Sequence, residues 1–290
     1  MRLFVPPLRG LPLSAGRIMG RGLGGLTFTI LPRYRNAALR NLKLIYGTEL
    51  SDRERARMAR AVFSHFGQVG AEFLKLPRLS DAQVNDMAVV NGEENMKEAL
   101  KVGKGVLLIT GHFGNWEFMA RWLAVHGYKL NVVARDARDP EATRLLADTR
   151  GQNGAKVLYR GNSARAILGC LKQNEIVAIL PDQNAADVFV PFLGVKTGTV
   201  DGPAVIHLKT HSPIVFSWCV RRDDGRFEIT FDAPVTVEAT GEKRKDVEGV
   251  MTLINARIGE WIRKYPTQWL WLHNRWKASP GVFDANSRAE

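Results

Sequence analysis

The hydrophobic pattern of the chain changes near residue 105. From there to residue 180, short continuous apolar runs alternate with segments in which apolar residues recur at helical spacing. Runs of this length are typical of strands buried on both faces, and strands that alternate with helices predict a largely parallel sheet. The expected strands are GVLLIT (105–110), KLNVVA (129–134), AKVL (155–158) and EIVAIL (175–180), with helices to about 126, around 141–152 and around 163–172.

Two more apolar runs follow the alternating region. PIVFSWCV (213–220) and RFEITF (226–231) are separated by only a few residues, so we expect an antiparallel pair at the edge of the sheet. A basic helix is predicted at roughly 244–264, and the aromatic, basic segment PTQWLWLHNRWK follows it. The chain shows neither an internal repeat nor a linker, which favours one α/β domain with a mixed, largely parallel sheet flanked by helices.

The segment 15–31 predicts an N-terminal amphipathic helix with arginine on its polar side. Its apolar face carries four residues: Met19, Leu23, Leu26 and Ile30. Arg17 and Arg21 fall on the opposite face. A helix of this kind lies in a membrane interface; the alternative is a helix that packs on its own domain, and the sequence favours neither. The uncharged run between Arg21 and Arg33 is too short to span a bilayer.

A long amphipathic helix is predicted behind residue 51. Ser51 and Glu54 have the spacing of a capping box, in which each residue satisfies a backbone N–H of the other. Apolar residues then continue at helical spacing up to Pro77. This helix is therefore expected to contribute to the core.

Composition narrows the functional classes. The 290-residue chain has 41 Lys and Arg against 29 Asp and Glu, a net charge of +12. This excess favours anionic lipid headgroups or an acidic carrier protein, or else it is a solvated surface without a partner. Nucleic acid is not expected, because an aromatic-rich RNA-binding signature, zinc-finger spacing and a recognition helix are all missing. Cys170 and Cys219 are far apart in apolar segments, which predicts two buried thiols and neither a disulfide nor a metal site.

The segment GHFGNWE (111–117) places a histidine and a glutamate directly behind the first predicted strand. In open α/β sheets, ligands bind beyond the carboxyl ends of the strands, and the two glycines of the segment permit a tight turn there. A helix that begins near residues 113–115 leaves His112 outside it. The Glu117 carboxylate is then able to fold back toward the imidazole.

This pair suits general-base catalysis. A carboxylate that holds one imidazole nitrogen as a donor leaves the other nitrogen ready to take a proton. The sequence has neither a G-x-S-x-G elbow nor a credible reactive cysteine, so we expect a hydroxyl of the substrate to attack a thioester, with His112 as the base. The alternatives are a structural histidine bonded within the turn and a hydrolase that uses the pair on water. A metal site is disfavoured, because H-E-x-x-H spacing is absent.

Six sequence blocks occur in order along the chain: RNAALRNLKLIYG (35–47), GHFGNWE (111–117), VVAR (132–135), GAKVLYR (154–160), PDQNAADVFVPFLG (181–194) and QWLWLHNRWK (268–277). Together they resemble the bacterial lipid A late acyltransferases, the lauroyl and myristoyl transferases within the H-x-x-x-x-[D/E] glycerolipid acyltransferases. The resemblance covers about residues 33–277.

The resemblance implies an acyltransferase that is docked on the cytoplasmic face of the inner membrane and needs no cofactor. It implies transfer of a fatty acyl group from acyl carrier protein, or coenzyme A, to a glycolipid hydroxyl, with His112 as the base and Glu117 as its partner. Four further residues are expected to bind substrate: Asn115, Arg135, Asp182 and Gln183. Arg135 suits paired hydrogen bonds to a phosphate, whereas Asp182 and Gln183 either contact substrate or anchor their loop.

The chain departs from the family pattern at two places. An N-terminal membrane span is missing, so we expect peripheral attachment through residues 1–34, then an acyltransferase domain at 35–278 and a flexible tail at 279–290. The family's D-Q-D reads D-Q-N at residues 182–184, and the apolar segment VFVPFLG (188–194) either lines an acyl pocket or closes the core. The acceptor stays open between a lipid A precursor, a phosphoinositide mannoside and an aminolipid; a non-catalytic lipid-binding relative is the alternative to an enzyme.

Overall fold

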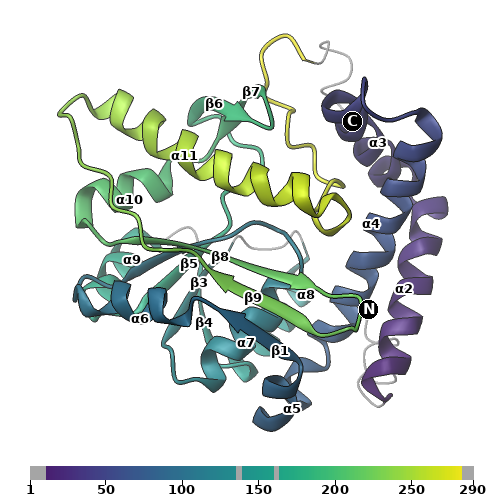
Figure 1. The fold of residues 1–290 in the computed structure, drawn as a ribbon, viewed down its shortest axis with the longest axis horizontal. Coiled ribbons are helices and arrows are strands. Elements are labelled where there is room, and N and C mark those ends of the chain that lie inside the picture. Colours follow the sequence, from purple (N-terminus) through teal and green to yellow (C-terminus); the bar gives the residue numbers. More distant parts are fainter. Residues whose placement is uncertain (1–10, 135–138, 160–162, 283–290) are drawn as a thin grey trace. The chain divides into compact units, whose positions relative to one another are not determined.

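The computed structural model describes residues 11–134, 139–159 and 163–282, and the chain forms two compact units (Figure 1). The sheet unit takes in two segments, Phe73–Leu180 and Pro203–Ala239. The helical unit takes in three segments, Met1–Glu72, Pro181–Gly202 and Thr240–Glu290. The predicted boundaries at residues 34 and 278 stay predictions.

Seven strands form the sheet of the sheet unit, in the order β1-β9-β8-β2-β5-β3-β4. Their bounds are β1 (Ala88–Asn91), β2 (Val106–Ile109), β3 (Leu130–Ala134), β4 (Ala155–Tyr159), β5 (Ile176–Ile179), β8 (Ile214–Arg221) and β9 (Phe227–Phe231). The five strands from β8 to β4 are parallel, whereas β9 is antiparallel to β8 and parallel to β1. The predicted mixed, largely parallel α/β sheet is confirmed.

Helices of the sheet unit cover the sheet and close its core. Their bounds are α5 (Asp81–Asp86), α6 (Glu93–Lys101), α7 (Trp116–Val125), α8 (Pro140–Gln152), α9 (Ser163–Lys172) and α10 (Gly202–Thr210), the last beginning at the unit boundary. All four residues of β2 and all four of β5 are buried, which explains why both strands read as continuous apolar runs. Phe118 and Leu123 of α7 share one core cluster with Leu108 of β2 and Met96 of α6.

The pair β8–β9 is antiparallel as predicted, but its predicted place at the sheet edge is wrong. Strand β1 pairs with β9 from Ala88↔Phe227 to Asn91↔Thr230 and forms the edge beyond it. This strand has only four residues, and none of them is fully buried. A strand so short and so exposed produces neither a continuous apolar run nor a clear alternation, which is why the sequence pattern missed it.

Among its described residues, the helical unit contains four long helices and a hairpin. Its elements are α2 (Leu13–Ile30), α3 (Pro32–Tyr46), α4 (Asp52–Phe73, whose last residue lies at the unit boundary), β6 (Val188–Phe192), β7 (Val195–Thr199) and α11 (Lys243–Lys264). The predicted capping box begins α4: Ser51 N–H donates to Glu54 Oε2 at 2.8 Å, and Glu54 N–H donates to Ser51 Oγ at 3.3 Å.

Helix α2 contacts α4 through its glycines and through Phe28, whose ring centroid lies 5.4 Å from that of Phe63. A Cβ on Gly20 would lie 2.5 Å from the Gly67 carbonyl oxygen, and one on Gly24 would lie 2.2 Å from the Phe63 carbonyl oxygen. The two backbones therefore approach more closely than any side chain permits. Arg17 of α2 also binds Glu72 of α4 at 2.5 Å. The helix thus packs on its own unit by its glycine face.

The segment VFVPFLG (188–194) forms strand β6 and the turn that leads into β7. Leu193 and Gly194 make its turn with φ values of 51° and 87°. The Phe192 ring lies 5.6 Å from that of Trp269 and 5.8 Å from that of Trp276. Within the helical unit, this segment therefore closes a core.

The aromatic tail is the centre of that core. Its tryptophans Trp269, Trp271 and Trp276, here called the tryptophan cluster, are at most 1% exposed. Asn41 of α3 fixes the tail, because its Nδ2 donates to the carbonyl oxygens of Trp271 at 2.8 Å and His273 at 2.7 Å. Two of the sequence blocks, 35–47 and 268–277, are thus joined by one buried amide.

Candidate active site

His112 lies three residues beyond the carboxyl end of β2, where an α/β sheet binds ligands. The residue is half-buried. Its ring meets the Trp116 indole edge-on, with ring centroids 5.3 Å apart and an interplanar angle of 70°. Trp116 is the first residue of α7, so the helix that follows the strand fixes the position of the imidazole.

The turn between β2 and α7 is held against the neighbouring strand β8. Gly114 has φ +59°, and a Cβ there would lie 1.8 Å from the Cys219 carbonyl oxygen; only glycine fits this position. The next residue, Asn115, donates its backbone N–H to the same oxygen at 2.9 Å. Its Oδ1 accepts from Phe118 N–H at 2.9 Å and so caps α7. A substrate contact by Asn115 stays a prediction.

Glu117 is 6% exposed, and two of the residues that the structure describes bind its carboxylate. Trp116 Nε1 donates to Oε1 at 3.0 Å. Arg150 of α8 donates through Nη2 to Oε1 at 2.6 Å and through Nε to Oε2 at 3.2 Å. The sequence led us to expect this carboxylate to turn toward His112; the structure shows both side chains in contact with Trp116, which links them.

Arg150 was not found by sequence reasoning. Burial alone lowers the pKa of its guanidinium, but the charge and hydrogen bonds of Glu117 outweigh this effect, and the net pKa is raised above its ordinary value. The only sequence signal was indirect: a buried carboxylate requires a cation, and the predicted helix around 141–152 offers arginines. The packing of α8 determines which of these arginines pairs with Glu117.

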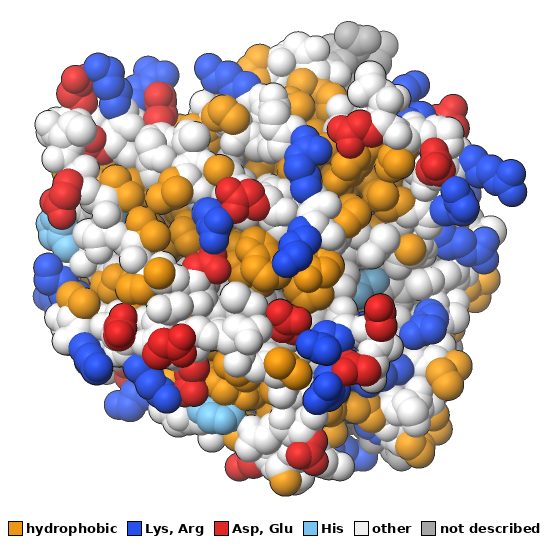
Figure 2. Space-filling model, in the orientation of Figure 1, with side chains coloured by type: hydrophobic (Ala, Val, Ile, Leu, Met, Phe, Trp, Pro, Cys, Tyr) orange, Lys and Arg blue, Asp and Glu red, His pale blue; other side chains and the backbone are white. Residues whose placement is uncertain are grey.

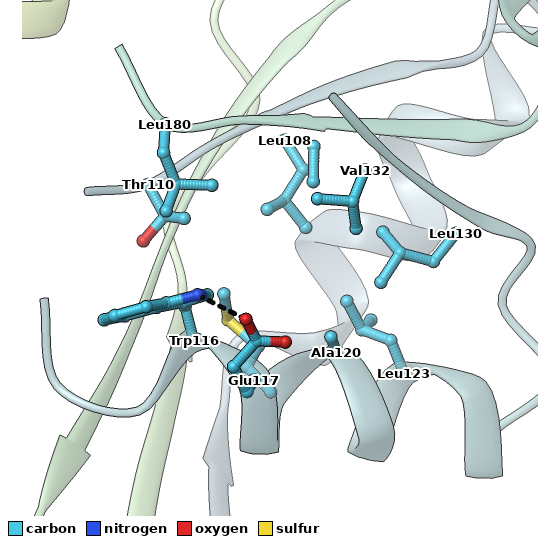
Figure 3. Close-up of a pocket in the computed structure, with 11 residues that line it drawn as sticks. Leu108, Thr110, Trp116, Glu117, Ala120, Leu123, Leu130, Val132 and Leu180 are labelled. Carbon is cyan, nitrogen blue, oxygen red and sulfur yellow. Dashed lines mark hydrogen bonds between the residues drawn. The ribbon is translucent and has the colours of Figure 1, made fainter. Parts of the chain in front are cut away.

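A small apolar cavity of about 20 Å³ lies beside Glu117, between α7 and the sheet (Figure 3). Thr110, Trp116 and Glu117 line one end, and Leu123 and Leu130 lie toward the other. A cavity of this size holds about one water molecule. A longer apolar ligand therefore requires the surrounding side chains to move apart.

Asp182 and Gln183 belong to the helical unit. Asp182 is buried, and its Oδ2 accepts from Trp269 Nε1 at 2.8 Å. Gln183 is half-buried. At the position where the family pattern differs, Asn184 Oδ1 accepts from Ala278 N–H at 3.0 Å. These bonds anchor the loop to the tail, one of the two roles that the sequence left open; substrate contact stays a prediction.

Arg135 lies outside the described residues, so its predicted contact with phosphate stays a prediction. The two cysteines are both buried, as expected. Burial, together with the nearby Glu175 carboxylate, raises the pKa of the Cys170 thiol. Neither observation favours an enzyme thiol as the nucleophile.

Helix α2 exposes the apolar face that the sequence predicted. Leu23 is 46%, Leu26 53% and Ile30 58% exposed. Among the described helices, none is both long enough and apolar enough to cross a bilayer. On the face that Figure 2 shows, lysine and arginine side chains are interspersed with acidic ones rather than gathered in one patch.

Comparison with known proteins shows the family of this chain. The sequence model of the bacterial lipid A biosynthesis acyltransferase family matches residues 3–278. Among curated relatives, the lipid A biosynthesis palmitoleoyltransferase of Escherichia coli K12 is 27% identical over 277 residues, which cover 93% of this chain and 87% of the relative. The lauroyltransferase of the same organism is 25% identical over 270 residues, 90% of this chain and 85% of the relative.

A relative named for a different lipid also matches. The phosphatidylinositol mannoside acyltransferase of Mycobacterium tuberculosis H37Rv is 23% identical over 226 residues, which cover 75% of this chain and 70% of the relative. The family predicted from the six sequence blocks is confirmed. Since the family model spans nearly the whole chain, this protein belongs to the bacterial lipid A biosynthesis acyltransferases.

Proposed function

We propose that this protein is a membrane-associated O-acyltransferase that moves a fatty acyl group from a thioester, on acyl carrier protein or coenzyme A, to a hydroxyl of a glycolipid. One observation carries the proposal: His112 lies just beyond the carboxyl end of β2 and against Trp116, whose side chain also lines an apolar cavity. A base that one side chain links to an apolar cavity suits a reaction between an acyl chain and an alcohol. Family membership supports the transferase class.

The proposed reaction has one transfer step without a covalent enzyme intermediate. His112 takes the proton of the acceptor hydroxyl as its oxygen attacks the thioester carbonyl carbon. The new C–O bond forms, the C–S bond breaks, and the imidazolium returns the proton to the leaving thiolate. General-base assistance of this kind contributes about 10²–10⁴-fold to the rate.

Glu117 and Arg150 support the base in this proposal. Arg150 holds the Glu117 carboxylate in place and balances its buried charge. The carboxylate accepts a hydrogen bond from Trp116 Nε1, and the Trp116 indole packs against the His112 ring. Glu117 thus orients His112 through Trp116 and stabilises the imidazolium electrostatically. Substrate contacts by Asn115, Arg135, Asp182 and Gln183 are kept as further predictions.

Helix α2 is proposed to lie in the surface of an anionic membrane. Its exposed leucines and isoleucine supply apolar contact, and the net charge of +12 supplies attraction. Binding to anionic vesicles should therefore weaken with salt, because such attraction is screened over about 8 Å at physiological ionic strength. Leu26→Ser should weaken binding further, whereas Gly22→Ser, on the same helix with open space around it, should not.

A lipid A precursor is the proposed acceptor, because relatives matched over about nine-tenths of the chain are named for lipid A biosynthesis. A phosphoinositide mannoside is the second candidate, from the mycobacterial relative. The inner membrane, on its cytoplasmic side, is the proposed location, since acyl thioesters of carrier protein or coenzyme A are the donors in the reaction above.

Product analysis tests the proposal. Purified protein is incubated with acyl carrier protein loaded with a fatty acid and with vesicles that contain the candidate acceptors, and lipids are identified by mass spectrometry. We expect an acylated glycolipid from the wild type and from His126→Ala, since His126 is exposed at the other end of α7. Free fatty acid alone would indicate a hydrolase, and vesicle binding without any product would indicate a non-catalytic lipid-binding protein.

A further inference from the structure

Thr110 carries a buried hydroxyl that the proposed mechanism has not used. The residue follows β2 directly and is 2% exposed. Its Oγ1 has no hydrogen-bond partner among the residues that the structure describes. The same residue lines the apolar cavity beside Glu117. In Figure 3 its hydroxyl points toward the Trp116 indole, on the side of the sheet where Glu117 lies.

A buried hydroxyl without a partner destabilises a fold, so its presence requires a reason. A valine would fill the same space without that cost. The surroundings indicate what the hydroxyl can bind: the cavity wall is otherwise almost entirely apolar beyond Glu117 and the Trp116 indole. A ligand with one polar acceptor at its head and an apolar chain behind it matches this wall. The acyl group of a thioester has that form.

Thr110 is also close to the proposed base. Two residues span at most about 7 Å of chain, so the backbones of Thr110 and His112 are no farther apart than that. Trp116 lines the cavity together with Thr110 and packs against the His112 ring. A carbonyl that accepts from Thr110 is therefore placed in the region where a hydroxyl activated by His112 attacks.

We propose that the Thr110 hydroxyl donates a hydrogen bond to the carbonyl oxygen of the acyl thioester, and that the acyl chain moves the side chains of the cavity apart as it enters toward Leu123 and Leu130. This role rests on the proposed acyl transfer. As the acceptor oxygen bonds to the carbonyl carbon, negative charge builds on the carbonyl oxygen, and the bond from Thr110 strengthens. It persists until the C–S bond breaks and the thiolate leaves with the proton carried by His112.

Ser217 of β8 offers a matched control. Leu107, Leu108 and Ile109 pair with Ile214, Val215 and Phe216, and one more step of this register places Ser217 beside Thr110. Ser217 is fully buried and its Oγ also has no partner among the described residues. Ser217 is not among the described residues that line the cavity. The two hydroxyls thus differ mainly in access to the proposed ligand.

The test compares steady-state transfer and thermal unfolding of the full-length protein and three variants. Thr110→Val should lower kcat by about 10²-fold, the effect of removing one oxyanion donor. Its Tm should stay the same or rise, because no hydrogen bond within the protein is lost. Thr110→Ser, which keeps a hydroxyl, should retain kcat within about 10-fold, and Ser217→Ala should stay within about threefold of the wild type.

Two results would overturn the role of Thr110 while transfer by the wild type still supports the proposed function. One is a Thr110→Val enzyme whose kcat stays within about threefold of the wild type. The other is a parallel fall of Tm and kcat in both Thr110→Val and Ser217→Ala, which would make the two hydroxyls a structural pair. A wild type that transfers no acyl group under any condition would overturn the proposed function, and this role with it.

Discussion

Each unit of the protein contains a buried carboxylate that accepts from an indole N–H with an arginine nearby, yet the two clusters are built differently. In the sheet unit, Glu117 binds Trp116 Nε1 and is paired directly with Arg150. In the helical unit, Asp182 binds Trp269 Nε1. There Arg275 gives its hydrogen bonds to other groups, the Gly198 carbonyl oxygen at 2.5 Å and Thr199 Oγ1 at 2.8 Å.

The pKa directions of the two arginines record this difference. The direct pair with Glu117 raises the pKa of Arg150. Burial lowers the pKa of Arg275 to about 10, and the Asp182 carboxylate only partly opposes that effect. Arg275 is fully buried over the Phe192 ring, 4.6 Å from its centroid. The same residue types thus hold a packed tail in one unit, and in the other they hold a tryptophan that contacts His112 and lines a cavity.

Breaking the direct pair should have the largest effect. Arg150→Met leaves the Glu117 carboxylate buried without its cation, and we expect a loss of about 3–5 kcal/mol in the free energy of unfolding. Arg144→Met, on the exposed face of the same helix, should change it by less than about 0.5 kcal/mol. The double variant Glu117→Gln/Arg150→Met should recover part of the loss. Denaturant unfolding measures all three, and an unchanged midpoint for Arg150→Met would contradict the pairing.

Removing the carboxylate charge should lower the rate of acyl transfer much more in one cluster than in the other. Glu117→Gln keeps an acceptor for Trp116 but loses the charge that supports the imidazolium, so transfer should fall by at least about 10²-fold. Asp182→Asn keeps an acceptor for Trp269, and we expect a fall of less than about 10-fold. Rates measured under saturating donor test this order. Equal losses of transfer rate in both variants would show that the Asp182 charge matters as much for transfer as the Glu117 charge.

The smallest expected effect is a pH dependence from Arg275. Its folded-state pKa of about 10 is below that of the unfolded chain, so between these values the unfolded chain binds more protons and stability rises with pH. The advantage of the wild type over Arg275→Met should therefore grow by about 1 kcal/mol between about pH 9 and 11. The free energy of unfolding at several pH values gives this difference. A difference that shrinks would show that the guanidinium is not desolvated.

The sequence pattern predicted the central strands and the position of His112 behind β2, because both depend on local pattern. β2 and β5 are buried on both faces, so they appear in the sequence as continuous apolar runs. A histidine that directly follows such a run lies at the ligand-binding end of the sheet. Strand β1 and the hairpin β6–β7 were missed. Strand β1 is too short and too exposed to give a periodic signal. The turn of the hairpin has Leu193 at positive φ, a conformation that a leucine does not predict.

The partners within the site could not be predicted, because they depend on contacts between distant segments. Arg150 meets Glu117 across 33 residues, and several arginines were equally suitable from spacing alone. Thr110 reads in the sequence as the last residue of a strand. Its significance comes only from the missing partner and from the cavity that it lines.

Single-turnover transfer by His112→Ala tests the central claim most directly. Protein in excess is mixed with labelled acyl thioester and acceptor vesicles, and lipid and intact protein are both analysed by mass spectrometry. We predict that the wild type yields acylated lipid with no acylated protein at any time, and that His112→Ala, folded by its unfolding curve, is slower by at least about 10²-fold. A variant that transfers at the wild-type rate, or an acylated form of the protein that reacts on to product, would contradict the account.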